Sequence, residues 1–255
     1  MLYQISQYLK FLFKSTNQHG VHSPFVYELV TKCFYDQTKH TEYHTIEKYR
    51  NQLLQNKNTI KVHDLGPGSR KTKTNMRQVN EIAKTSGTTL KRAKLLFRIA
   101  KYLKPDKTLE LGTSLAIATQ ALSLGNPKAR ITTIEGCPEI ASLSKKQLNE
   151  YRNIEFKIGD FKKVIPKLTS EHYDLIFFDG NHQKKATLQY FETLLPTINN
   201  NTMFIFDDIY WSKDMTEAWK IIKQHPKVTV TIDTFFWGMV FFREEQAKEH
   251  FTIRV

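Results

Sequence analysis

From residue 107 onward, short apolar segments alternate five times with helical patterns. The pairs are KTLELG and SLAIATQALSL, RITTIEG and PEIASLSKKQLNE, NIEFKIGD and FKKVIPKL, YDLIFFDG and KKATLQYFETLL, and TMFIFDD and DMTEAWKIIKQ. Such alternation is typical of a parallel sheet with helices on both faces. The segments KVTVTID and WGMVFFR follow as a hairpin, which adds an antiparallel strand. The sequence therefore predicts an α/β fold, doubly wound around a mostly parallel seven-stranded sheet with an antiparallel final strand.

The residues before this pattern read as helices and loops. Residues 88–103 predict an amphipathic helix that ends before Pro105, because apolar side chains recur on one face. These side chains are Ala93, Leu96, Phe97, Ala100 and Leu103. A helix from Leu2 to Phe13 is also expected, packed on its own protein rather than anchored on a membrane surface. We divide the chain into a helical N-terminal extension, residues 1–87, and an α/β domain, residues 88–255.

Positive charge is concentrated in the first part of the chain. The net charge is +13; residues 1–106 hold 19 Lys and Arg against 7 Asp and Glu, whereas residues 107–255 hold 19 against 18. A basic segment attracts nucleic acid, anionic lipid or an acidic substrate. Solubility alone is an equal alternative, so the charge does not choose a partner.

Cysteine content indicates a reducing compartment, and hydropathy gives no sign of a membrane span. Cys33 and Cys137 lack the spacing of a metal motif and are too few for a disulfide framework. Apolar runs stay shorter than a membrane span, and the N-terminus lacks the pattern of a signal peptide. We therefore expect a cytoplasmic protein without a membrane span.

Two stretches have the form of a strand followed by a glycine turn: IKVHDLGPGSR at 60–70 and TLELGTSLAIA at 108–118. Ligands of doubly wound sheets bind at the carboxyl ends of the strands, and an acid that binds ribose is expected about 20 residues after the glycine turn, at the end of the next strand. After Gly112 this acid is Glu135, whereas the corresponding segment after Gly66, KTSGTT, holds neither strand nor acid. The turn at Gly112 is therefore the predicted cofactor turn.

With these motifs in order, residues 90–243, about 60% of the chain, resemble a class I S-adenosylmethionine-dependent methyltransferase with its Rossmann-like fold. LELGTS resembles the first motif of that family, ITTIEG its ribose-binding strand end and IGDF its adenine-side turn. YDLIFFDGNH and MFIFDDIYW resemble the fourth and fifth strand ends, and the terminal hairpin resembles the last strands.

The resemblance implies which residues bind the cofactor. The family's close backbone approach to the methionine part falls on Gly112, and donors to its carboxylate fall on Thr113 and Ser114. The full implied set is Glu110, Gly112, Thr113, Ser114, Glu135, Gly136, Asp160, Phe161 and Asp179. The chain departs from the family at Ala116, where a further glycine is common.

Three carboxylates follow the fourth and fifth strands: Asp179, Asp207 and Asp208. Crowded carboxylates repel unless a proton, a base or a metal neutralises them, and oxygen ligands suit Mg²⁺ or Ca²⁺. The pattern is similar to metal-dependent O-methyltransferases of the catechol and sugar-modifying kinds, which implies that these three residues hold a divalent cation. Asn181 is a further candidate, and capping of helix N-termini is the alternative role of the acids.

His182 lies three residues after Asp179, the spacing at which sugar-modifying relatives carry a general base. The alternative is a surface or capping histidine. Tyr210 and Trp211 follow the acid pair and either wall an aromatic acceptor pocket or belong to the core.

These features predict transfer of a methyl group from S-adenosylmethionine to a hydroxyl of a small molecule. Two alternatives stay open: an RNA methyltransferase that uses the basic N-terminal part, and a non-catalytic module that binds the cofactor. Residues 60–87 form either a substrate lid or a structural loop. The cationic side chains of the lid hypothesis are Arg70, Lys71, Lys73 and Arg77.

Overall fold

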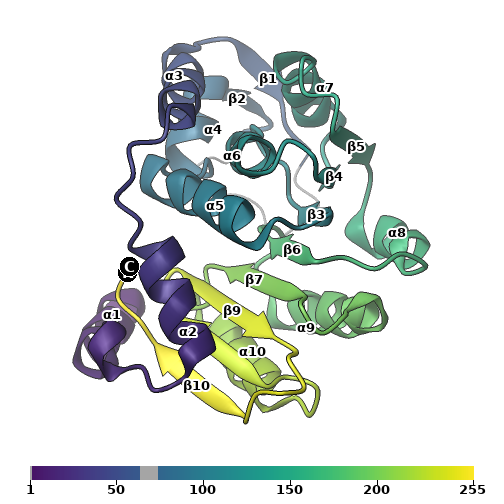
Figure 1. Cartoon of the computed structure of the whole chain (residues 1–255). Coiled ribbons are helices and arrows are strands. Elements are labelled where there is room, and N and C mark those ends of the chain that lie inside the picture. Colours follow the sequence, from purple (N-terminus) through teal and green to yellow (C-terminus); the bar gives the residue numbers. More distant parts are fainter. Residues whose placement is uncertain (1, 64–73) are drawn as a thin grey trace. The chain divides into compact units, whose positions relative to one another are not determined.

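The computed structural model describes residues 2–63 and 74–255, and the chain divides into two compact units (Figure 1). The first unit combines Met1–Tyr35 with Ile165–Val255, and the second is Asp36–Val164. The fold is α/β with a mostly parallel sheet of eight strands, five from the first unit and three from the second. The predicted fold class is confirmed. The expected boundary after residue 87 does not separate these units, and the separate role given to residues 1–87 stays a prediction.

Three parallel strands form the sheet portion of the second unit, in the order β3-β4-β5. They are β3 (Lys107–Leu111), β4 (Arg130–Glu135) and β5 (Ile154–Ile158). The helices that follow them are α6 (Ile117–Gly125), α7 (Pro138–Gln147) and α8 (Phe161–Val164). The carboxyl end of each strand leads through a loop into a helix, as the expected alternation requires.

Helices before β3 complete the second unit. The helix α5 (Leu90–Leu103) begins after Thr89, whose side chain accepts a hydrogen bond from the Arg92 N–H, and it packs on α6. Its predicted face is buried except at Leu103. The helices α3 (Glu42–Gln55) and α4 (Val79–Thr85) and the antiparallel strands β1 (Thr59–Lys61) and β2 (Met76–Gln78) precede it. The segment DLGPGS, with Arg70, Lys71 and Lys73, lies outside the described residues.

The first unit holds five strands in the order β6-β7-β9-β8-β10. They are β6 (Leu175–Phe178), β7 (Met203–Asp207), β8 (Val230–Asp233), β9 (Trp237–Phe241) and β10 (Glu249–Thr252). β9 is antiparallel to both β7 and β8, as the predicted hairpin requires. The count of seven strands was wrong, because β10 pairs with β8 as an eighth. Only Phe251 of its four residues is buried, so it has no apolar pattern to detect.

The helices of the first unit include two that follow strands, α9 (Lys184–Leu194) and α10 (Lys213–Gln224). The others are α1 (Leu2–Lys14) and α2 (Pro24–Leu29). Short 3-10 or π segments are Gln18–Gly20, Val30–Phe34, Ile165–Leu168 and Leu195–Thr197. Among the described residues, no helix combines the length and the apolar character that crossing a bilayer requires.

The helix α1 packs on its own unit through aromatic side chains. The Tyr3 hydroxyl donates to Thr216 Oγ1 at 2.7 Å, and the rings of Tyr8 and Phe11 contact Phe235. The apolar residues of the other side remain exposed, and Phe13 retains 89% of its accessible surface. Phe11 is the buried residue of this helix, whereas Tyr8 remains 42% exposed although its ring contacts Phe235.

Gly238 in β9 lies against the buried ring of Trp219 in α10, and an added Cβ would lie 2.7 Å from ring atom Cζ3. We expect Gly238→Ala to lower the free energy of unfolding by about 1–3 kcal/mol, the usual cost of overpacking. Urea unfolding measures this loss. In the background of Trp219→Leu, which makes room for the methyl group, the same substitution should cost less. Equal costs in both backgrounds would contradict the steric explanation.

Candidate functional site

The loop between β3 and α6 has a backbone that is strongly constrained. Gly112 has φ +106°, which favours glycine, and Ser114 and Ala116 have φ +47° and +56°. The N–H groups of Gly112 and Thr113 both donate to the Ile134 carbonyl, at 3.0 and 3.2 Å, and so join the loop to β4. Ala116 adopts the left-handed conformation, in which glycine is more usual. The loop therefore makes this turn although alanine stands where the family often has glycine.

Glu135, at the end of β4, connects two loops. Its Oε2 accepts a hydrogen bond from the Ser114 N–H and its Oε1 accepts one from the Cys137 N–H, both at 2.9 Å. A carboxylate oxygen has lone pairs for more than one donor. The side chain is partly exposed, and the two N–H donors hold its carboxylate in position.

Glu110 is the buried acid of this loop system. Its Oε2 accepts hydrogen bonds from the hydroxyls of Thr119 at 2.5 Å and Thr133 at 2.6 Å, and the Thr133 hydroxyl also contacts that of Thr113 at 2.6 Å. Its Oε1 is buried and has no partner among the described residues. Burial raises the pKa of Glu110 to about 7, although the two threonine hydrogen bonds act in the opposite direction.

This pKa predicts how stability depends on pH. Because the folded state binds the Glu110 proton more tightly than the unfolded state, stability is complete below the ordinary pKa of 4.5 and is lost as pH rises to about 7. The difference corresponds to about 3 kcal/mol. Glu110→Gln should remove this part of the pH dependence, as urea unfolding of both proteins across that interval would show. An identical slope in the two proteins would contradict the assignment.

The turn after β5 lies at the same strand ends. The Gly159 N–H donates to the Glu135 carbonyl at 2.9 Å, and Asp160 accepts from the Lys162 N–H at 2.9 Å as α8 begins. Phe161 is half-buried at the start of that helix. The structure thus brings together the predicted glycine loop, the ribose-binding acid with Gly136, and the adenine-side turn. Cofactor binding by these residues stays a prediction.

Two residues that the sequence reasoning missed support the loop. The Tyr49 hydroxyl in α3 donates to the Leu115 carbonyl at 2.8 Å, and the Ser144 hydroxyl in α7 donates to the Ser114 carbonyl at 2.7 Å. Tyr49 is 66 positions away from Leu115, and a tyrosine in a helix gives no signal of this role.

A second cluster lies in the first unit, at the ends of β6 and β7. Phe178 pairs with Phe206, so the residues that follow, Asp179 and Asp207, are neighbours. One ligand atom each from Asp179, His182 and Asp207 lies within 4.8 Å of the others, and His182 Nε2 is 3.9 Å from Asp179 Oδ1. The convergence of the strand ends therefore joins the predicted base to two of the predicted metal ligands.

The remaining residues near this cluster differ in their surroundings. Asp208 has φ +54° and does not belong to the group of three, and its role as a ligand stays a prediction. The Asn181 amide donates to the Tyr190 hydroxyl at 3.1 Å, while its Oδ1 is buried without a partner among the described residues. The Tyr210 hydroxyl donates to Asp233 at 2.5 Å, which favours the structural alternative for that tyrosine.

Comparison with known proteins identifies a matching family model and solved structures with the same fold. Residues 109–209 match the family model of a methyltransferase domain. Three solved structures share the fold. The O-methyltransferase TomG of Streptomyces achromogenes, in complex with SAM, is 17% identical with a TM-score of 0.55; the match covers 62% of this chain and 82% of that one. The SAH-bound Podospora anserina methyltransferase PaMTH1 is 15% identical with a TM-score of 0.56, over 82% and 99%. The Bacillus cereus O-methyltransferase, in complex with SAH, is 16% identical with a TM-score of 0.53, over 83% and 98%.

One curated protein also matches in sequence. A 105-residue segment, 41% of this chain, is 33% identical to the eukaryotic translation initiation factor 2-alpha kinase 2 of Schizosaccharomyces pombe. That segment spans 14% of the kinase's length. Residues 109–209 are the segment that matches the methyltransferase-domain model, and the chain shares its fold with solved methyltransferases.

Proposed function

We propose that this protein transfers the methyl group of S-adenosylmethionine to a hydroxyl of a small molecule, assisted by a divalent cation. The observation that carries the proposal is the position of Glu135, whose carboxylate is held by the Ser114 and Cys137 N–H groups beside the glycine loop. This is the place at which dinucleotide- and nucleoside-binding sheets present an acid to a ribose. The SAM and SAH complexes of structural neighbours support the choice of cofactor.

The residues of the second unit fit this cofactor. Glu135 would accept from the ribose hydroxyls, and Gly112 would let the backbone approach the methionine part without a Cβ in the way. The buried Oε1 of Glu110 lacks a partner among the described residues, so a cationic group of the cofactor would compensate it. Thr113 is buried. The Ser114 N–H donates to Glu135, and the Ser114 carbonyl accepts from the Ser144 hydroxyl.

The residues of the first unit fit a divalent cation. Asp179 and Asp207 would supply carboxylate oxygens, and Asn181 has a buried Oδ1 that lacks a partner among the described residues. Hard oxygen donors of this kind suit Mg²⁺ or Ca²⁺. When bound, such an ion lowers the pKa of a hydroxyl and orients it. We retain Asp208 as a further predicted ligand.

His182 is proposed as the general base. Methyl transfer to a hydroxyl releases a proton, and an imidazole accepts it near neutral pH. Its Nε2 lies 3.9 Å from Asp179 Oδ1, which puts the ring next to the proposed cation ligands, where the acceptor oxygen would bind. The remaining task of the protein is to hold the methyl donor and the oxygen in line.

Calorimetric titration with S-adenosylhomocysteine, followed by an acceptor screen with labelled S-adenosylmethionine, tests the proposal. We expect binding at micromolar or lower concentration and label transfer to a hydroxylated compound, with loss of transfer in the presence of a chelator. Binding without transfer to any acceptor would favour a non-catalytic cofactor-binding module. Absence of binding would overturn the proposal.

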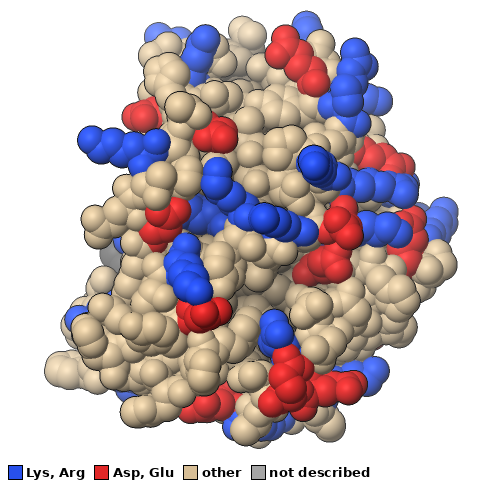
Figure 2. All heavy atoms as spheres, viewed as in Figure 1, with Lys and Arg blue, Asp and Glu red and all other residues tan. Residues whose placement is uncertain are grey.

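RNA is the second candidate substrate, because residues 1–106 carry most of the net positive charge. On the face drawn in Figure 2, however, Lys and Arg side chains lie among Asp and Glu side chains rather than in one basic patch. Phosphate contacts release counterions, so RNA binding that weakens steeply with salt would support this candidate. We rank the small-molecule acceptor first because the drawn face does not show one basic patch.

A further inference from the structure

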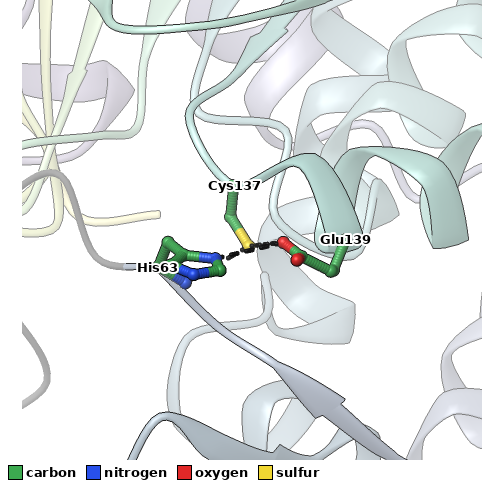
Figure 3. Close-up of side chains that lie close together, drawn as sticks. All are labelled: His63, Cys137 and Glu139. Atoms are coloured by element: carbon green, nitrogen blue, oxygen red, sulfur yellow. Dashed lines mark hydrogen bonds and ion pairs between the residues drawn. The ribbon is translucent and has the colours of Figure 1, made fainter.

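Three side chains of metal-binding type meet in the second unit, apart from the residues assigned to the cofactor (Figure 3). His63 follows β1, Cys137 precedes the first turn of α7, and Glu139 lies within that turn. His63 Nδ1 is 3.2 Å from Glu139 Oε2, and Cys137 Sγ is 3.3 Å from the same oxygen. One ligand atom from each of the three lies within 4.8 Å of the others.

These separations approach those around a tetrahedral zinc ion. Zn²⁺ lies at about 2.0–2.2 Å from nitrogen and oxygen ligands and at about 2.3 Å from sulfur, which places neighbouring ligand atoms roughly 3.3–3.6 Å apart. The observed 3.2 and 3.3 Å are within a few tenths of an ångström of that range. Sulfur, imidazole nitrogen and carboxylate oxygen together suit Zn²⁺ and exclude Mg²⁺ or Ca²⁺ as the preferred ion, because those ions favour oxygen alone.

Exposure of the three side chains also suits a metal site. Cys137 is buried, while the side chains of His63 and Glu139 are 45% and 39% exposed. An ion can therefore approach from solvent and rest on a thiol at the base of the cluster. In the structure the Cys137 thiol donates a hydrogen bond to Glu139, and a bound metal would displace this proton.

We propose that His63, Cys137 and Glu139 bind one Zn²⁺ ion, with a fourth position left for water. The ion would tie the segment after β1 to the start of α7, across more than 70 positions of sequence. It would also fix the turn that holds Glu135, because the Cys137 N–H donates to Glu135 Oε1. That effect on the cofactor site rests on the proposed function, whereas the zinc site itself does not.

Metal binding by the purified, metal-free full chain tests the site. Zn²⁺ alone is titrated against a chromophoric chelator, and Co²⁺ is used as a spectroscopic probe, since a thiolate ligand gives a near-ultraviolet charge-transfer band. We expect this band, which reports the thiolate-containing site and not the aspartate cluster. Cys137→Ser should abolish the band and weaken Zn²⁺ binding by at least about 100-fold. His63→Ala and Glu139→Gln should each weaken Zn²⁺ binding by at least about 10-fold, because loss of a residue that only hydrogen-bonds a metal ligand already lowers metal affinity by about 10–100-fold.

Matched variants separate this site from others. His44→Ala removes an exposed histidine of the same unit, and Cys33→Ser removes the other cysteine; both should keep the band. Asp207→Asn should keep it as well, because the aspartate cluster has no sulfur. If Cys137→Ser fails to fold, His63→Ala provides the test, because the His63 side chain is exposed. Zn²⁺ binding that is equal in the wild type, Cys137→Ser and His63→Ala would overturn the proposal.

Titration with S-adenosylhomocysteine, with and without Zn²⁺, distinguishes the two proposals. Tighter cofactor binding in the presence of Zn²⁺ in the wild type, and not in His63→Ala, supports the link to Glu135. Zinc binding without any cofactor binding would retain the metal site and reject the proposed function. Cofactor binding without a thiolate–cobalt band would retain the function and reject the metal site.

Discussion

Glu135→Gln is expected to weaken binding of S-adenosylhomocysteine by about 100-fold or more. The glutamate would accept two ribose hydroxyls, and hydrogen bonds to a charged group are worth about 1.5–3 kcal/mol each. Two of the weaker kind amount to about a hundredfold in affinity. The amide also has one acceptor oxygen in place of two, so either the Ser114 or the Cys137 N–H loses its partner. Calorimetric titration measures the change.

Glu150→Gln is the matched control for this variant. Glu150 is exposed in the same unit. Its substitution removes the same negative charge at a position outside the glycine loop. It should bind the ligand as the wild type does. Unchanged affinity in a Glu135→Gln protein that melts cooperatively would show that the cofactor binds elsewhere and would remove the main support for the proposed function.

Asp207→Asn is expected to reduce metal-dependent turnover by about 100-fold or more while leaving affinity for S-adenosylhomocysteine within about twofold. A bound cation supplies several kcal/mol of charge stabilisation, and an amide is a weaker ligand than a carboxylate. Asp207 is 6% exposed and keeps its shape in this substitution, so the fold should tolerate it. Steady-state rates across a range of Mg²⁺ concentrations provide the measurement.

Asp214→Asn is the control, because Asp214 is an exposed acid in the first turn of α10. It should turn over like the wild type. If the wild-type rate is unaffected by a chelator, the metal proposal fails whatever Asp207→Asn does. A rate for Asp207→Asn equal to that of the wild type, in an enzyme that needs metal, would place the ion elsewhere.

The fold class could be predicted because apolar periodicity reports burial directly. Strands such as LIFF at β6 and MFIFD at β7 are buried at every position, which gives continuous apolar runs that a parallel sheet requires. β10 gave no such signal, since Glu249 and His250 are exposed and its stability depends on pairing with β8. Strand pairing at an edge is a property of backbone hydrogen bonds, which the side chains do not encode.

Part of the candidate site could also be read along the chain. Gly112 and Glu135 stand at the ends of successive strands, and parallel strands bring such ends together, so the sequence by itself determined that the glycine loop and this acid would meet. It likewise determined that acids would follow the fourth and fifth strands. These are consequences of connectivity in a parallel sheet, in which neighbouring strand ends meet at one edge.

Only the tertiary structure decided what each of these groups contacts. It gave Glu110 a buried oxygen that has no partner among the described residues, and it gave Glu135 two backbone donors. It also set Asp207 rather than Asp208 beside Asp179 and His182, and brought His63 to Cys137 and Glu139. The physical reason is that hydrogen bonds and metal coordination act over about 3 Å. Pattern and spacing fix which strand end a residue occupies, but backbone conformation and packing fix where its side-chain atoms lie.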